Sequence, residues 1–143
     1  MSRFAQGLFT IKNPNKYVGK HVPRYRSGWE HAFMTFCDNH PSVVQWASEA
    51  VHIPYQNPIT GKKTQYIPDF FVLYKDKNNK VLAEIVEIKP KSQSMIESKT
   101  DYKTRQIIAV NWAKWEAARR WCSKQGLVFR VINEDSIFRN GKR

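Results

Sequence analysis

The sequence is poor in features that mark several familiar classes of protein. Two of its 143 residues are cysteines, too few for a framework of several disulfides, and both Cys37 and Cys122 fit the apolar stripe of a helix as reduced core residues. The four histidines lack the spacing of a zinc site, and there is no glycine-rich phosphate loop. No apolar run could cross a bilayer, and the first residues do not resemble a signal peptide. We therefore expect a soluble intracellular protein.

Acidic residues are also scarce. The chain has 12 aspartates and glutamates against 24 lysines and arginines, a net charge of +12. Such an excess attracts polyanions, above all nucleic acid, although acidic membranes and acidic proteins would be attracted too. The hydrophobic content of 41% excludes a wholly disordered chain. The length fits one domain, which buries about two thirds of its unfolded surface.

The most informative stretch is a predicted β-hairpin. Residues 67–72 and 84–90 are rich in β-branched and aromatic residues, and the turn-forming residues 76–79 lie between them. Strand alternation places Asp69, and then Glu87 and Lys89, on faces that also carry apolar side chains. Both strands are apolar on both faces, a pattern typical of central, covered strands.

Three charges on such faces need a partner. An isolated carboxylate there would lose hydration worth several kcal/mol and would normally take up a proton. Two carboxylates and an ammonium at one end of a hairpin would make a site for a divalent cation, with Lys89 left to hold or polarise a water. Alternatively, Pro68-Asp69 is ordinary strand-start punctuation, and residues 87–89 are the solvated end of a strand.

A helix is predicted to begin at Ser27 and to stop at Pro41, with Trp29, Phe33, Phe36 and Cys37 as its buried stripe. Glu30 completes a Ser-x-x-Glu capping box, in which its side chain would reach back to the Ser27 amide. Glu49 is interpreted as exposed or salt-bridged and is left outside the site.

The rest of the chain follows an alternating pattern of strands and helices. Strands are predicted at 43–49, 52–55 and 127–132, with a turn at 57–62 and a long helix from about 102 to Gly126. Trp112 and Trp115 are predicted to lie on the side of that helix that packs in the protein core. Its other side would face DNA or solvent, and carries Lys103, Arg105, Lys114, Arg119, Arg120 and Lys124.

Three regions are predicted: a basic, extended arm at 1–26, a core domain at 27–133 and a short basic tail at 134–143. The arm mixes lysines and arginines with aromatic residues, so it would either contact phosphates and stack on bases or serve as a solubilising segment wrapped on the surface.

Pro68-Asp69, the hairpin and Glu87-Ile88-Lys89, with Glu30 on a preceding helix, resemble the motif of the PD-(D/E)XK nuclease superfamily. The resemblance implies an α/β fold with a restriction-endonuclease-like core, a central mixed β-sheet flanked by helices. It also implies a nuclease in which Asp69, Glu87 and the Ile88 carbonyl hold Mg²⁺, with Mn²⁺ as a substitute. Lys89 would orient or help to deprotonate the attacking water, and Glu30 would complete the acidic cluster.

Other segments resemble the head-completion nucleases of T4-like tailed phages: 12–14, 16–17, 40–44, 46–49, 52–55, 67–70 and 87–90. This likeness implies DNA processing and head-tail joining after packaging, in the host cytoplasm or the virion, with head, portal or neck proteins as partners. The endonuclease subunit of Tn7-like transposons is similar in its core, but its motif more usually reads Gln-x-Lys. A non-catalytic DNA-binding plug of the phage head, and a junction or repair nuclease, are the alternatives.

Overall fold

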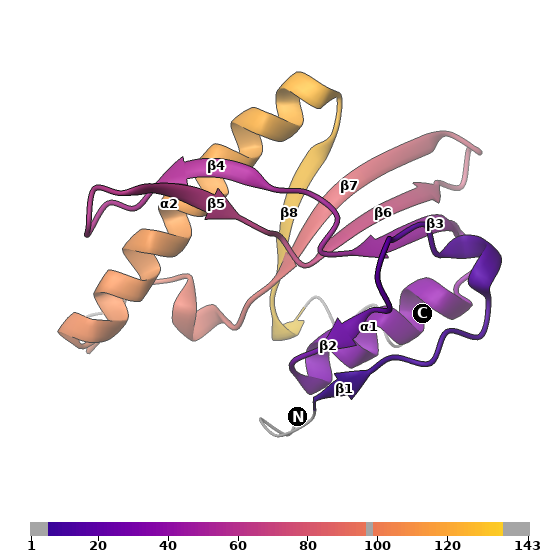
Figure 1. The fold of residues 1–143 in the computed structure, drawn as a ribbon, viewed down its shortest axis with the longest axis horizontal. Coiled ribbons are helices and arrows are strands. Elements are labelled where there is room, and N and C mark those ends of the chain that lie inside the picture. Colours follow the sequence, from indigo (N-terminus) through magenta and orange to yellow (C-terminus); the bar gives the residue numbers. More distant parts are fainter. Residues whose placement is uncertain (1–5, 97–98, 136–143) are drawn as a thin grey trace.

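The computed structural model describes residues 6–96 and 99–135, and its centre is a four-stranded sheet of order β3–β6–β7–β8 (Figure 1). The strands are β3 (Val43–Ser48), β6 (Phe70–Lys75), β7 (Val81–Ile88) and β8 (Val128–Ile132). β6 is antiparallel to both β3 and β7, whereas β8 runs parallel to β7. The sheet is therefore mixed, which confirms the predicted fold class.

β6 and β7 form the predicted hairpin and are the two central strands. The Asp76 carboxylate fixes the turn, because Oδ1 accepts hydrogen bonds from the amides of Asn78 (2.8 Å) and Lys80 (3.0 Å). Asn79 adopts a left-handed backbone (φ 62°), which asparagine tolerates better than most residues. The resulting register pairs Phe70 with Val86 and brings the start of β6 beside the end of β7.

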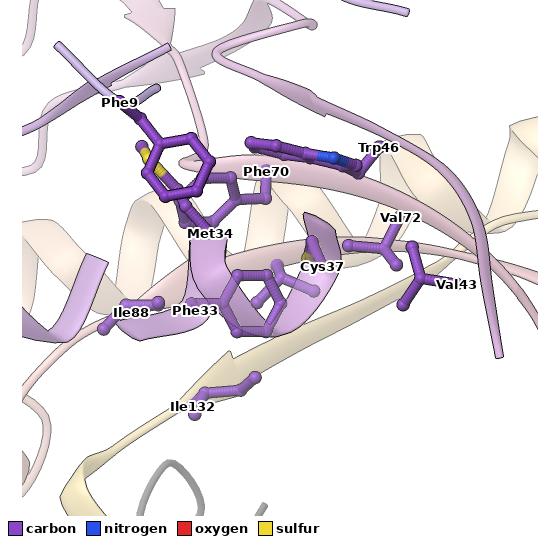
Figure 2. Close-up of a cluster of buried hydrophobic side chains, with 11 residues drawn as sticks. Phe9, Phe33, Met34, Cys37, Val43, Trp46, Phe70, Val72, Ile88 and Ile132 are labelled. Atoms are coloured by element: carbon purple, nitrogen blue, oxygen red, sulfur yellow. The ribbon is translucent and has the colours of Figure 1, made fainter. Parts of the chain in front are cut away.

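Helix α1 (Gly28–Asn39) covers one face of the sheet and begins at the predicted cap, where the Ser27 hydroxyl accepts from the Glu30 amide (3.1 Å). Its Phe33, Met34 and Cys37 are buried in the main hydrophobic cluster, which Figure 2 shows together with the facing sheet residues. The predicted stripe was thus right for Phe33 and Cys37. Trp29 and Phe36 are only partly buried, whereas Met34, which the predicted stripe did not include, is fully buried.

Helix α2 (Tyr102–Gln125) lies on the opposite face and ends, as predicted, at Gly126, which has a left-handed backbone (φ 75°). It packs against β8 and against a separate hairpin of β4 (Ile53–Gln56) and β5 (Lys63–Tyr66), which lies across it in Figure 1. A second buried cluster forms there, centred on Ile53, Tyr66, Trp115 and Ala118. Since Phe129 and Val131 of β8 belong to this cluster and Ile132 to the other, strand alternation confirms that the two clusters lie on opposite faces.

Two residues of α2 differ from the prediction. Trp115 is buried as expected, but the assignment of Trp112 to the core was wrong, since 47% of its surface is exposed and its indole N–H donates to the Ser94 carbonyl (2.9 Å). Lys114, predicted on the exposed side, is half-buried with its ammonium 5.7 Å from the centre of the Tyr66 ring. The helical periodicity of the sequence predicted the spacing of the apolar residues of α2. It did not predict which side of the helix β4 and β5 cover.

The segment that precedes Asp69 also needs a correction. The predicted strand began at residue 67, but β5 ends at Tyr66 and β6 begins only at Phe70, so residues 67–69 belong to neither strand. Pro68 lies between them and lacks the amide hydrogen that a strand ladder requires. The chain therefore leaves one sheet and enters another within three residues, and Asp69 lies at that junction.

Residues 6–26 contain little regular structure: β1 (Gly7–Leu8), a 3-10 turn η1 (Pro14–Lys16) and β2 (Arg24–Tyr25). They nevertheless pack against the core, because Phe9 is buried in the main cluster and the Val18 amide donates to the Trp46 carbonyl (2.9 Å). The buried Asp38 carboxylate at the end of α1 accepts from the amides of Lys12 (2.8 Å) and Asn13 (3.0 Å). This segment is wrapped on the surface of the domain.

The remaining described element is a 3-10 turn, η2 (Lys91–Gln93), after β7. Residues 1–5 of the predicted arm and 136–143 of the predicted tail lie outside the described residues. Both cysteines are buried as free thiols, as predicted. Within the described part of the chain, neither helix combines the length and apolar character that a membrane crossing needs.

Candidate active site

The site predicted from the hairpin lies where β6 begins and β7 ends. Asp69 directly precedes β6, Glu87 and Ile88 are the last residues of β7, and Lys89 follows. Backbone hydrogen bonds hold the two acids in place: the Ile88 amide donates to Asp69 Oδ2 (2.8 Å), and the Asp69 amide donates to Glu87 Oε1 (3.3 Å). Each carboxylate is thus fixed by the backbone beside the other.

Lys89 supplies the nearest cation. Its ammonium lies 3.8 Å from Glu87 Oε2, and its amide donates to the Ile132 carbonyl (2.9 Å), which ties it to β8. The side chain of Glu87 is 8% exposed, whereas that of Lys89 is 28% exposed and reaches the surface. One ammonium at this distance offsets the charge of one carboxylate only in part.

The electrostatics of the pair reflect this shortage of positive charge. Burial, followed by the charge of Glu87, raises the pKa of Asp69 well above its ordinary value. Burial also raises the pKa of Glu87, and the charge of Lys89 opposes that rise. Burial thus outweighs the opposing charges of Lys89 and Lys114, and a further cation would stabilise these two carboxylates.

The residues present fit a hard divalent cation. Carboxylate and carbonyl oxygens are the ligands that Mg²⁺ takes in proteins, usually from one or two carboxylates together with water and substrate oxygens. In an extended strand the N–H and C=O of one residue point to the same side, so the Ile88 carbonyl faces the side on which Asp69 accepts its amide. Among the described residues there is no cluster of three or more acidic, histidine or cysteine side chains suited to a metal, so the set is limited to two carboxylates.

Glu30 lies near this pair but makes its own contacts. Its carboxylate accepts from the Arg26 amide (3.3 Å) and the Ser27 hydroxyl (3.4 Å), so the expected contact with the Ser27 amide was wrong. Burial raises the pKa of Glu30, and its charge is close enough to raise the pKa of Asp69. The structure therefore brings Glu30 within electrostatic range of Asp69 while it caps α1.

Glu49 has the position that the sequence predicted for it, in an ion pair with the Arg26 guanidinium. Its amide donates to the Asp69 carbonyl (2.9 Å), and its left-handed backbone (φ 50°) is uncommon for a residue other than glycine. This turn at the end of β3 helps to fix the backbone of Asp69.

Two further residues line the site and were missed in the sequence. The hydroxyl of Tyr66, which is 4% exposed, lies close to Glu87 without reaching hydrogen-bond geometry and has no partner within the described residues. Burial lowers the pKa of Lys114, while the charge of Glu87 raises it. Helical spacing places Lys114 on the same side of α2 as Lys103. The packing of α2 on β4 and β5 is what directs Lys114 toward Glu87.

A mixed sheet with an aspartate at the start of one central strand and a Glu-x-Lys at the end of its neighbour defines a nuclease of the PD-(D/E)XK type. Comparison with known families agrees, because residues 40–134 match the TnsA-like endonuclease N-terminal domain, and the chain belongs to that family. The matched span includes Asp69, Glu87 and Lys89 but not Glu30. The chain is also 34% identical to the head completion nuclease of Enterobacteria phage T4, over 92% of each sequence.

Proposed function

We propose that this protein is a magnesium-dependent deoxyribonuclease. It would hydrolyse phosphodiester bonds at an active site formed by Asp69, Glu87 and Lys89. The observation that carries the proposal is the buried pair of Asp69 and Glu87, fixed by backbone amides and only partly neutralised by Lys89. A purely structural DNA-binding module has no need of two carboxylates beside a polyanion, because each repels phosphate.

In this proposal the chain's own groups have separate tasks. Asp69, Glu87 and the Ile88 carbonyl would hold Mg²⁺ or its substitute Mn²⁺, and the bound ion would polarise the phosphoryl oxygen and activate water. Lys89 reaches the surface from Glu87, where it can orient the attacking water or accept its proton. Glu30 would add negative charge behind Asp69.

DNA would be held mainly through its phosphates. The net charge of +12 supports binding that weakens steeply with salt and carries little sequence specificity. Mapping the cut positions on a long duplex tests this directly. A flat distribution of cuts supports the proposal, and one dominant recognition sequence contradicts it.

The relative from phage T4 supports a biological role. By analogy with the head completion nuclease, we propose that this protein processes packaged DNA late in phage head assembly and prepares the head for tail joining. It would act in the host cytoplasm during assembly, in contact with head, portal or neck proteins. A phage that carries Asp69→Ala should accumulate DNA-filled heads without tails, which electron microscopy would count.

The first biochemical test is digestion of plasmid and linear DNA with magnesium or manganese. Wild type should cut, whereas Asp69→Ala and Lys89→Ala should bind DNA and not cut. Lys77→Ala, in the exposed turn at the far end of the same hairpin, is the matched control and should cut like wild type. Nicking of the closed circle indicates endonuclease action, and loss of label from linear ends indicates exonuclease action. A folded wild type that binds without cutting would contradict the proposal.

A further inference from the structure

A groove runs beside the candidate site, between the turn of the β4–β5 hairpin and helix α2. Its volume is about 690 Å³, and Lys89 and Lys114 line it together with Lys103 near the start of α2. Because burial and the charges of Lys89 and Glu87 act on Lys114, that lysine marks the part of the groove next to the catalytic residues. The groove is therefore continuous with the candidate active site.

The lining of the groove suits an anion. It contains three lysines and several neutral polar side chains, and none of the described residues that line it is acidic. Asn57 and Asn111 already bond to the backbone, through Ile59 and Thr60 in one case and Gln93 in the other. The three lysines therefore determine that the groove favours a negatively charged ligand.

The spacing of the lining residues on α2 indicates an extended ligand. Lys103, Ile107, Val110 and Lys114 recur at intervals of three and four residues and so form one stripe of the helix. At a rise of 1.5 Å per residue, the stripe is about 16 Å long. A DNA strand carries one phosphate per roughly 3.4 Å of duplex axis, so a strand lying along the stripe would present about four or five phosphates.

We propose that this groove holds the phosphate backbone of the cleaved DNA strand on one side of the scissile phosphate. Lys114 would contact the phosphate next to the reacting one, and Lys103 a phosphate several nucleotides away. Ile59 and Ile107, each 49% exposed, flank the groove and offer apolar contact to deoxyribose without reading a base. This inference rests on the proposed nuclease function and assigns a substrate path to it.

The test compares two variants that lose the same charge from the same helix. Lys103→Ala removes a groove lysine, and Lys124→Ala removes an exposed lysine in the last turn of α2, outside the groove. Binding to a short fluorescent duplex is measured in EDTA over a range of salt concentrations, so that no cleavage occurs. Lys103→Ala should bind about three- to tenfold more weakly, with a salt slope smaller by about one, and Lys124→Ala should stay close to wild type.

A second measurement locates the DNA without a change in sequence. Lysines of the wild-type protein are acetylated with and without the same duplex, and the modified positions are identified by mass spectrometry. DNA should protect Lys103 at least several-fold more than Lys124. Equal protection of the two lysines, or equal binding by the two variants, would overturn the groove assignment.

The two proposals fail in different ways. If the variants bind alike while wild type cuts and Asp69→Ala does not, the groove assignment is wrong and the nuclease proposal stands. If Lys103→Ala alone loses affinity while wild type never cuts with magnesium or manganese, the groove binds DNA and the nuclease proposal is wrong.

Discussion

Asp69 Oδ2 accepts a hydrogen bond of 2.8 Å from the amide of Ile88, the residue between Glu87 and Lys89. The start of one strand is thereby bonded to the centre of the Glu-x-Lys motif at the end of the next. The geometry of the acids consequently depends on the register of a single hairpin, a local feature of the chain.

The cost of holding Asp69 beside Glu87 should be measurable as stability. Because burial and Glu87 raise the pKa of Asp69 in the folded state, ionisation of Asp69 opposes folding. This cost is absent below the unfolded-state pKa, appears as the pH rises through that value and is complete above the raised folded-state pKa. Asp69→Asn should therefore raise the melting temperature in EDTA at neutral pH, and the difference should disappear in acid.

The control for this experiment is Asp76→Asn, which makes the same chemical change in the hairpin turn and keeps an oxygen acceptor there. It should not raise the melting temperature. A wild type more stable than Asp69→Asn at neutral pH in EDTA would contradict the interpretation of the acid pair as electrostatically unfavourable.

The two roles of Glu30 can be separated by substitution. Glu30→Gln keeps one oxygen, which can still accept from the Arg26 amide, and places an amide nitrogen near the Ser27 hydroxyl. It removes the charge near Asp69, so cleavage should fall about 10- to 100-fold with little change in stability. Ser27→Ala removes the cap and should cost about 1 kcal/mol of unfolding free energy without changing the cleavage rate of folded protein. Cleavage assays and urea denaturation on both variants provide the measurements, and wild-type activity in Glu30→Gln would contradict a catalytic role.

Asp38 should be among the most sensitive polar residues. It is 1% exposed and accepts from the amides of Lys12 and Asn13, so Asp38→Ala would leave two partly buried amides without an acceptor, at a cost of about 3 kcal/mol. Urea denaturation measures the loss, and faster tryptic cleavage after Lys12 and Lys16 would locate it. The neighbouring Asn39→Ala should change stability by less than about 0.5 kcal/mol, because Asn39 bonds at an exposed site on α1.

Phe9 and Leu8 provide a matched pair for the packing of the N-terminal segment. Phe9 is buried with its ring centre 5.9 Å from that of Trp46, whereas Leu8 is 60% exposed. Phe9→Ala should destabilise the protein by about 3 kcal/mol and Leu8→Ala by less than about 0.5 kcal/mol, as measured by urea denaturation. Equal effects would show that residues 6–26 do not belong to the core in solution.

The parts of this site that could be predicted from the sequence are those formed by contacts between residues close together in the chain. Asp69, Glu87 and Lys89 follow from one hairpin with a short turn, so alternation and turn chemistry place them together. Tyr66 and Lys114 come from β5 and α2, whose contact depends on packing between elements far apart in the chain. Periodicity alone could not distinguish the buried side of α2 from the exposed one, which is why Trp112 was misplaced.

The parallel pairing of β7 with β8 has a consequence for the order in which the protein matures. β7 carries Glu87, and β8 follows it only after the whole of α2. During synthesis on the ribosome, β7 therefore remains an edge strand until residues 128–132 emerge, and Lys89 lacks its bond to Ile132. The candidate active site is thus completed late in translation, because a nascent chain that lacks residues 128–132 has no β8 to hold Lys89.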